Sequence, residues 1–204
     1  MLRKFLFSLS LVSTAAALAE PISVTTSFSI LGDVTRRIGG DKVVVTEIVK
    51  ANQNMHIYRI TPQDAKRLKN SQLILLNGKG FESNEFIKAA KASNVPVVLA
   101  SDHIQSVHHA EKHDHDHHHD GDDPHVWQDP VLMKQYSQNI ADALIKIDPQ
   151  NKEYYSGSLK KYQQQLDELH QTAQQAFATV PKEQRKVLTS HDSFAYLGAR
   201  YQVK

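Results

Sequence analysis

Apolar residues in the first half of the chain gather in short runs that are rich in β-branched side chains and bounded by turn residues. Such runs predict strands, here at residues 22–28, 42–49, 71–76 and 96–100. The segments between them predict helices at residues 31–38, from Thr61 onward and at residues 82–92. This alternating order is typical of a parallel sheet covered by helices, so we expect an α/β fold.

The second half of the chain predicts helices. A first helix should begin at Asp129-Pro130 and end before Asp148-Pro149. A much longer helix should cover residues 152–179, because apolar residues recur there at intervals of three and four: Tyr155, Leu159, Tyr162, Leu166, Leu169, Ala173 and Phe177. Its length suits a spine between two lobes. A short strand at residues 186–189 and a helix at residues 194–201 would begin a second α/β lobe.

The N-terminus indicates export. Arg3 and Lys4 precede a short apolar run, and Ala17-Leu18-Ala19 forms a cleavage site, which together predict a signal peptide at residues 1–19. The apolar run is too short to span a membrane, so we expect no direct membrane insertion. The chain has no cysteine, which excludes disulfides and thiolate metal ligands. These features favour a periplasmic protein.

The charge of the chain argues against nucleic acid as a partner. The formal net charge is +2 for the full sequence, and without Arg3 and Lys4 the basic and acidic residues balance at 22 each. A protein that neutralises phosphates needs an excess of basic residues. We therefore expect no nucleic acid binding.

Three histidines follow predicted strands. His56 comes after the second strand, His125 after the fourth, and His191 after the strand predicted at residues 186–189. In open α/β sheets, ligands bind beyond the carboxyl ends of the strands. Imidazole is also the commonest neutral metal ligand. These residues therefore predict one shared transition-metal site.

A second group of histidines lies in a polar run without apolar periodicity, in a loop predicted at residues 101–122. Flexible imidazoles among carboxylates can bind metal ions weakly and pass them on, although a solvated loop without function has the same composition. We expect an auxiliary metal loop formed by His108, His109, His113, His115, His117, His118 and His119.

Several motifs resemble the solute-binding proteins of bacterial zinc and manganese ABC transporters. The matching stretches are Leu31-Gly32-Asp33, Met55-His56-Ile57-Tyr58, Leu76-Asn77-Gly78, Asp123-Pro124-His125-Val126-Trp127 and Thr189-Ser190-His191-Asp192-Ser193. The resemblance implies two α/β lobes joined by a rigid helix, with one metal ion held by His56, His125 and His191. It implies a monomer that is not an enzyme and that delivers its ion to a membrane ABC permease.

The resemblance also bears on the metal and on the length of the chain. Zinc-binding members carry a histidine at the third ligand position, as His191 does here, so the expected ion is Zn²⁺, with Mn²⁺ less favoured. Independently, imidazole suits zinc and carboxylate suits manganese. The family's remaining ligand, an aspartate in the second lobe, has no counterpart before Lys204. We therefore expect a C-terminally truncated member.

The expected organisation has four parts. These are the signal peptide at residues 1–19, an N-terminal metal-binding lobe at 20–150 with the His-rich loop at 101–122, a linking helix at 151–180, and the start of an incomplete second lobe at 181–204.

Two other functions remain open. A secreted hydrolase or lyase could use a three-histidine zinc site with an open water position, but the chain has no H-E-x-x-H motif. The consecutive residues Ser190-His191-Asp192 could not easily converge as a catalytic triad. A truncated fragment without function is the third possibility.

Overall fold

The computed structural model describes residues 20–107 and 122–204. The predicted signal peptide and residues 108–121, which contain all the auxiliary histidines, lie outside the described residues.

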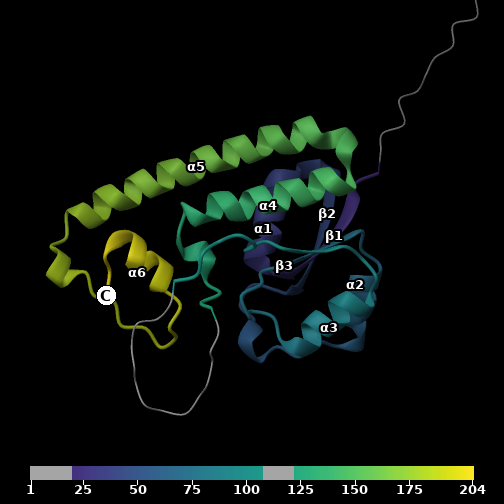
Figure 1. Ribbon diagram of the computed structural model, residues 1–204, viewed down its shortest axis with the longest axis horizontal. Helices are drawn as coiled ribbons and strands as arrows, with labels where there is room; N and C mark the ends of the chain where they lie inside the picture. Colours follow the sequence, from purple (N-terminus) through teal and green to yellow (C-terminus); the bar gives the residue numbers. More distant parts are fainter. Residues whose placement is uncertain (1–19, 108–121) are drawn as a thin grey trace, which may run out of the picture.

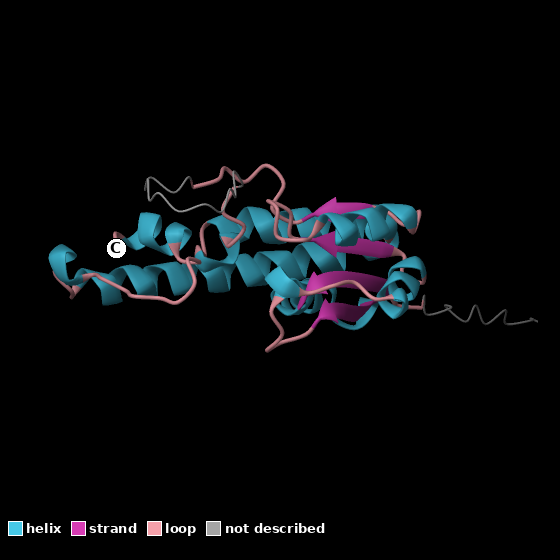
Figure 2. Ribbon diagram, turned by 90° about the horizontal axis from the view of Figure 1, so that it is seen from below, coloured by secondary structure: helices cyan, strands magenta, loops and turns pink. Residues whose placement is uncertain are grey.

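The sheet has four parallel strands: β1 (Ile22–Phe28), β2 (Val43–Val49), β3 (Leu73–Leu76) and β4 (Val97–Leu99). Their order is β2-β1-β3-β4, and in the register Val24 pairs with Val45 on one side and with Leu73 on the other. Figure 2 shows the strands side by side at one end of the molecule. The predicted α/β fold with a parallel sheet is confirmed.

Helices cover both faces of the sheet (Figure 1). One face carries α1 (Ser29–Gly39), α4 (Leu132–Ile147) and α5 (Lys152–Ala178), which contact one another, and the other carries α2 (Pro62–Lys69) and α3 (Asn84–Ala92). The last helix is α6 (Ala195–Tyr201). Short 3-10 turns complete the described chain: η1 (Gly40–Lys42), η2 (Met55–Ile57), η3 (Val126–Gln128), η4 (Pro149–Asn151) and η5 (Lys182–Gln184).

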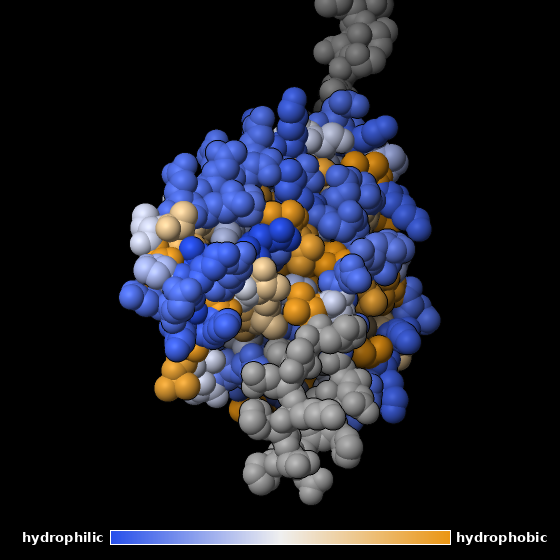
Figure 3. All heavy atoms as spheres, turned by 60° about the vertical axis from the view of Figure 1, so that its left-hand side comes forward, coloured by the Kyte–Doolittle hydropathy of each residue, from blue (hydrophilic) through white to orange (hydrophobic). Residues whose placement is uncertain are grey.

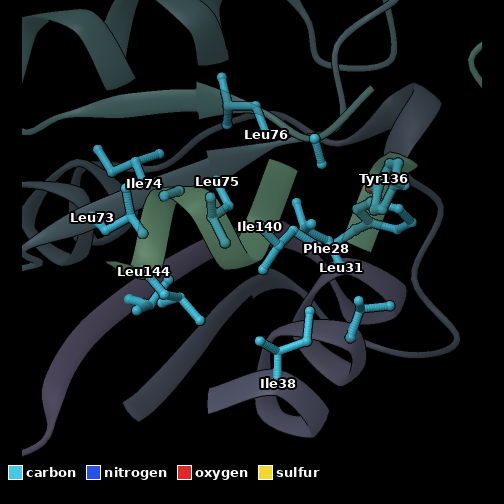
Figure 4. Packing of buried hydrophobic residues seen from close by; sticks show 14 of the residues in the cluster. Phe28, Leu31, Ile38, Leu73, Ile74, Leu75, Leu76, Tyr136, Ile140 and Leu144 are labelled. Carbon is cyan, nitrogen blue, oxygen red and sulfur yellow. The ribbon is translucent and has the colours of Figure 1, made fainter. Parts of the chain in front are cut away.

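The hydrophobic core is centred on β3, whose four residues are all buried. A parallel strand that is covered on both faces reads as a continuous apolar run, and Leu-Ile-Leu-Leu is such a run. Figure 4 shows these side chains packed with residues of α1 and α4, among them Leu31, Ile38, Ile140 and Leu144. Burying each such side chain contributes about 1.5–3 kcal/mol.

The long helix α5 is packed over only part of its length. It has 27 residues, which at 1.5 Å per residue corresponds to about 40 Å. Tyr155, Leu159 and Leu166 are buried, whereas Leu169 on the same predicted stripe is 56% exposed. The helix then continues beyond α4 towards α6 (Figure 1), where Phe177 stacks on Tyr201 with ring centroids 5.0 Å apart. The predicted stripe therefore packs on the sheet lobe only as far as Leu166.

The prediction of a strand at residues 186–189 is wrong. The stretch is irregular, and Leu188 is fully exposed. Its neighbourhood makes two sheet-like hydrogen bonds, in which Lys204 N donates to Arg185 O and Val187 N donates to Lys204 O, both 2.8 Å long. Both hydrogen bonds involve Lys204 alone. Pairing with a single residue does not stabilise a strand, which needs neighbouring strands and a covered face.

Candidate metal centre

His56 lies on the short turn η2, directly after β2. The Asn54 side chain caps this turn by accepting a hydrogen bond from His56 N at 2.9 Å, and Met55 anchors it in the core. The segment that follows is tied to the start of α2, since Tyr58 OH donates to Asp64 Oδ2 at 2.8 Å. Burial and this hydrogen bond raise the pKa of Tyr58 to about 12. The turn is thus held at both ends, while the His56 ring stays exposed.

His125 lies just before η3 and is buried, with 6% of its surface exposed. Asp123 Oδ1 accepts a hydrogen bond from His125 N at 2.9 Å and lies 2.7 Å from His125 Nδ1. A carboxylate can only accept, so this contact places the ring proton on Nδ1 and leaves Nε2 available for a metal ion. Asp123 is therefore the positioning partner of this ring.

His191 lies in the loop before α6, and helix docking sets its place. Tyr196 OH donates to Asp123 O at 2.8 Å, and Arg200 forms an ion pair with Asp129 at 2.8 Å. Both contacts join α6 to the segment that carries His125. As a result, His191 Nε2 lies 3.2 Å from His125 Nε2, although the two residues are 66 positions apart in the sequence.

The structure brings the three predicted histidines together. The ring centroids of His56, His125 and His191 are 4.9–5.7 Å apart, and one nitrogen from each ring lies within 4.8 Å of the others. A tetrahedral ion with Zn–N bonds of about 2.0–2.1 Å separates its ligand atoms by roughly 3.3–3.4 Å. The His125–His191 pair already has nearly that separation.

The surroundings of the three rings are aromatic and uncharged on one side. The Phe81 ring lies 5.4 Å from that of His56, and the Trp127 ring lies 5.2 Å from that of His125. They line a cavity of ≈590 Å³ in which Lys50 is the charged residue; among the described lining residues none is an aspartate or a glutamate. The possible donors that the described lining offers from these three residues are therefore imidazole nitrogens, without a carboxylate beside them.

Lys79 holds the two flanks of the predicted His-rich loop. Its Nζ donates to Ile104 O and to Ser106 Oγ, both at 2.7 Å, and lies 3.9 Å from a carboxylate oxygen of Asp122. The segment that leads into Asp123 and His125 is thereby anchored at its base. The auxiliary histidines themselves lie outside the described residues, so their role stays a prediction.

Nearly all of the described chain matches one protein family. The family model described as zinc-uptake complex component A, periplasmic, matches residues 24–204. The chain belongs to this family. The resemblance inferred from the motifs is confirmed.

The relatives are named for different metals. A manganese ABC transporter substrate-binding lipoprotein, PsaA from Streptococcus pneumoniae, is 33% identical over 197 residues, which are 91% of this chain and 61% of the relative. The iron-binding protein YfeA from Yersinia pestis is 30% identical over 204 residues, or 96% of this chain and 64% of the relative. The chain thus spans a little over three fifths of these relatives.

Solved structures share the fold. A manganese-bound periplasmic metal-binding protein from Candidatus Liberibacter asiaticus superposes with a TM-score of 0.79 at 28% identity, covering 90% of this chain and 67% of that one. A zinc-bound deletion mutant of ZnuA gives a TM-score of 0.80 at 28% identity, covering 90% and 68%. In residues 20–107 and 122–204, no helix has the length and apolar character needed to cross a membrane.

Proposed function

We propose that this chain binds one divalent transition-metal ion through His56, His125 and His191, as the binding component of an ABC uptake system. The observation that supports this proposal most directly is the convergence of three imidazoles from three separate loops, with one nitrogen of each within 4.8 Å of the others. A hydrogen-bonded carboxylate already orients one of the rings.

The proposed ion is zinc. The related proteins are variously named for manganese, iron and zinc, so the argument rests on the donor set. Imidazole nitrogen suits zinc, whereas manganese prefers oxygen ligands, and no described residue that lines the cavity is a carboxylate. Water can occupy the fourth position of a zinc ion held by three histidines.

A carrier fits the site better than a zinc hydrolase does. A hydrolase needs a general base within hydrogen-bond reach of the metal-bound water. The described lining of the cavity offers no carboxylate for this task, and Asp123 is engaged by His125. The relatives, moreover, are named for substrate binding and metal binding.

The wider setting is part of the proposal. Residues 1–19 would direct the chain to the periplasm, where the monomeric carrier would hand its ion to a membrane permease. Residues 20–150 would form the metal-binding lobe, residues 151–180 the linking helix, and residues 181–204 part of a second lobe. His108, His109, His113, His115, His117, His118 and His119 would bind further ions weakly.

Calorimetric zinc titration tests the site. To remove the auxiliary histidines, residues 108–121 are deleted from the parent chain and from both variants. We expect one tight site in the parent and a loss of more than about 100-fold in affinity for His125→Ala, since even the outer partners of a ligand are worth about 10–100-fold. His103→Ala is the matched control, because the His103 side chain is 81% exposed. Equal zinc binding by His125→Ala and the parent would refute the site.

A further inference from the structure

The Asn77 side chain joins the end of β3 to the segment that carries His125. It is completely buried, and its Nδ2 donates to Pro124 O at 3.0 Å and to Gly78 O at 3.1 Å. Its Oδ1 accepts from Tyr136 OH on α4 at 3.0 Å. A residue that follows a core strand therefore reaches the peptide group directly before a proposed metal ligand, 47 positions along the chain.

Glu82 holds the backbone of Asn77 in place. Glu82 Oε1 accepts from Asn77 N and from Ser27 Oγ, both at 2.6 Å, and Oε2 accepts from Gly78 N at 3.0 Å. Burial raises the pKa of Glu82, and the donated hydrogen bonds counteract this effect by favouring the carboxylate. Gly78 has a φ of +89°, a conformation that favours glycine. The Asn77 side chain thus starts from a fixed backbone.

The Pro124 carbonyl controls the peptide plane that contains His125 N. Because the peptide unit is planar, fixing the direction of this carbonyl fixes the direction of the His125 N–H. That N–H donates to Asp123 Oδ1, the same oxygen that lies 2.7 Å from His125 Nδ1. Pro124 O accepts a second hydrogen bond from Val126 N at 2.9 Å, which closes the turn around His125.

We propose that Asn77 is a positioning residue for His125, which it orients through the Pro124 carbonyl. Each polar atom of its side chain is engaged by Pro124, Gly78 or Tyr136, so Asn77 is not itself a ligand. Without the Nδ2 donor, the Pro124–His125 peptide would keep only its bonds with Val126 N and Asp123, and the geometry shared by Asp123 and the His125 ring would loosen. The consequence for metal binding rests on the proposed function, whereas the ring geometry does not.

Two substitutions separate this role from simple packing. Asn77→Ala removes the bonds to Pro124, Gly78 and Tyr136, whereas Tyr136→Phe removes only the last of these and keeps the aromatic ring. The first readout is nitrogen NMR of the His125 ring in the metal-free chain, assigned by comparison with His125→Ala. We expect the Nδ1-protonated form in the parent and in Tyr136→Phe, and a mixture of tautomers in Asn77→Ala.

The second readout is zinc affinity, with circular dichroism to verify folding. We expect a loss of about 10–100-fold for Asn77→Ala, as for other partners that orient a ligand, and a much smaller loss for Tyr136→Phe. If Asn77→Ala does not fold, Asn77→Asp takes its place, because it keeps the shape and the acceptor for Tyr136 but has no amide donor. A folded Asn77 variant with the ring signals and affinity of Tyr136→Phe would overturn the proposal. A parent chain that binds no zinc would instead refute the proposed function, and the metal-free NMR comparison would still decide the role of Asn77.

Discussion

At the scale of single residues, the proposed metal centre would depend on side chains that do not themselves reach the metal. Asp123 fixes the proton of the His125 ring, and Asn77 fixes the peptide that precedes it. The sequence pointed to the three histidines because each stands in a short motif after a predicted strand, although the strand predicted before His191 does not form. It could not point to Asn77 in the same way, because the contact with Pro124 joins segments far apart in the chain. The Asp-x-His spacing at residues 123–125 was a local sign of the Asp123 contact.

The charge of the Asp123 side chain should contribute more to zinc affinity than its shape does. Asp123→Asn keeps the volume but replaces a charged acceptor by a weaker amide oxygen, so the Nδ1-protonated tautomer of His125 loses its stabilisation. We expect zinc affinity to fall about 10–100-fold. Calorimetry measures this loss, with Asp142→Asn as the matched control, because the exposed Asp142 lies on α4 and its carboxylate accepts only from Gln138 of the same helix. Equal losses in both variants would mean that net charge, and not ring orientation, sets the affinity.

At the scale of elements, the sequence predicted features that depend on local residues better than features that depend on tertiary contacts. The helix predicted from Thr61 onward begins with a capping box, in which Asp64 N donates to Thr61 Oγ1 at 3.2 Å and Thr61 N donates to Asp64 Oδ2 at 3.0 Å. A cap involves residues three apart, so the sequence contains all of it. A strand at residues 186–189 needed neighbours that the pattern of β-branched residues cannot supply, and it does not form.

The cap of α2 should stabilise the fold in a pH-dependent way. Burial tends to raise the pKa of Asp64, but hydrogen bonds from Thr61, Tyr58 and Arg67 outweigh it and hold the pKa below its usual value. A carboxyl group with a lowered pKa contributes stability above its unfolded pKa, and this contribution disappears as the pH falls through its folded pKa. Thr61→Ala should therefore cost about 0.5–2 kcal/mol at pH 7, and the cost should shrink in acid, below about pH 4.

Urea unfolding of the parent and of Thr61→Ala at several pH values measures this cost. Thr172→Ala is the control, because the exposed Thr172 makes only a backbone contact within α5. A cost for Thr61→Ala that stays constant from pH 7 to acid would show that the Asp64 carboxylate is not part of the cap.

At the scale of the whole molecule, the three histidines of the proposed metal centre lie between the sheet lobe and the C-terminal segment. Figure 2 shows the sheet at one end of the molecule and α6 towards the other. Figure 3 looks onto the C-terminal end, where hydrophobic surface lies in separate areas between hydrophilic side chains. The exposed apolar residues of this segment include Val187, Leu188 and Phe194, whereas Tyr196 and Tyr201 of α6 are buried. The C-terminal segment is thus docked through α6, whereas the residues between α5 and α6 are largely exposed.

Limited proteolysis should begin between α5 and α6. The backbone around Val187 and Leu188 is irregular and exposed, and a protease cuts most readily where few contacts must open. His191 follows directly, so an ion that joins it to His56 and His125 would close the same loop against the sheet lobe. A ligand that binds only the closed form stabilises it by RT ln(1 + [L]/Kd), about 2.7 kcal/mol at 100 times Kd. Saturating zinc should therefore slow this first cut by roughly 100-fold, and His191→Ala should abolish the protection. A first cut within β1–β4 would show that the segment between α5 and α6 is more firmly held than its exposed residues indicate. Equal protection of His191→Ala and the parent would show that His191 takes no part in metal binding.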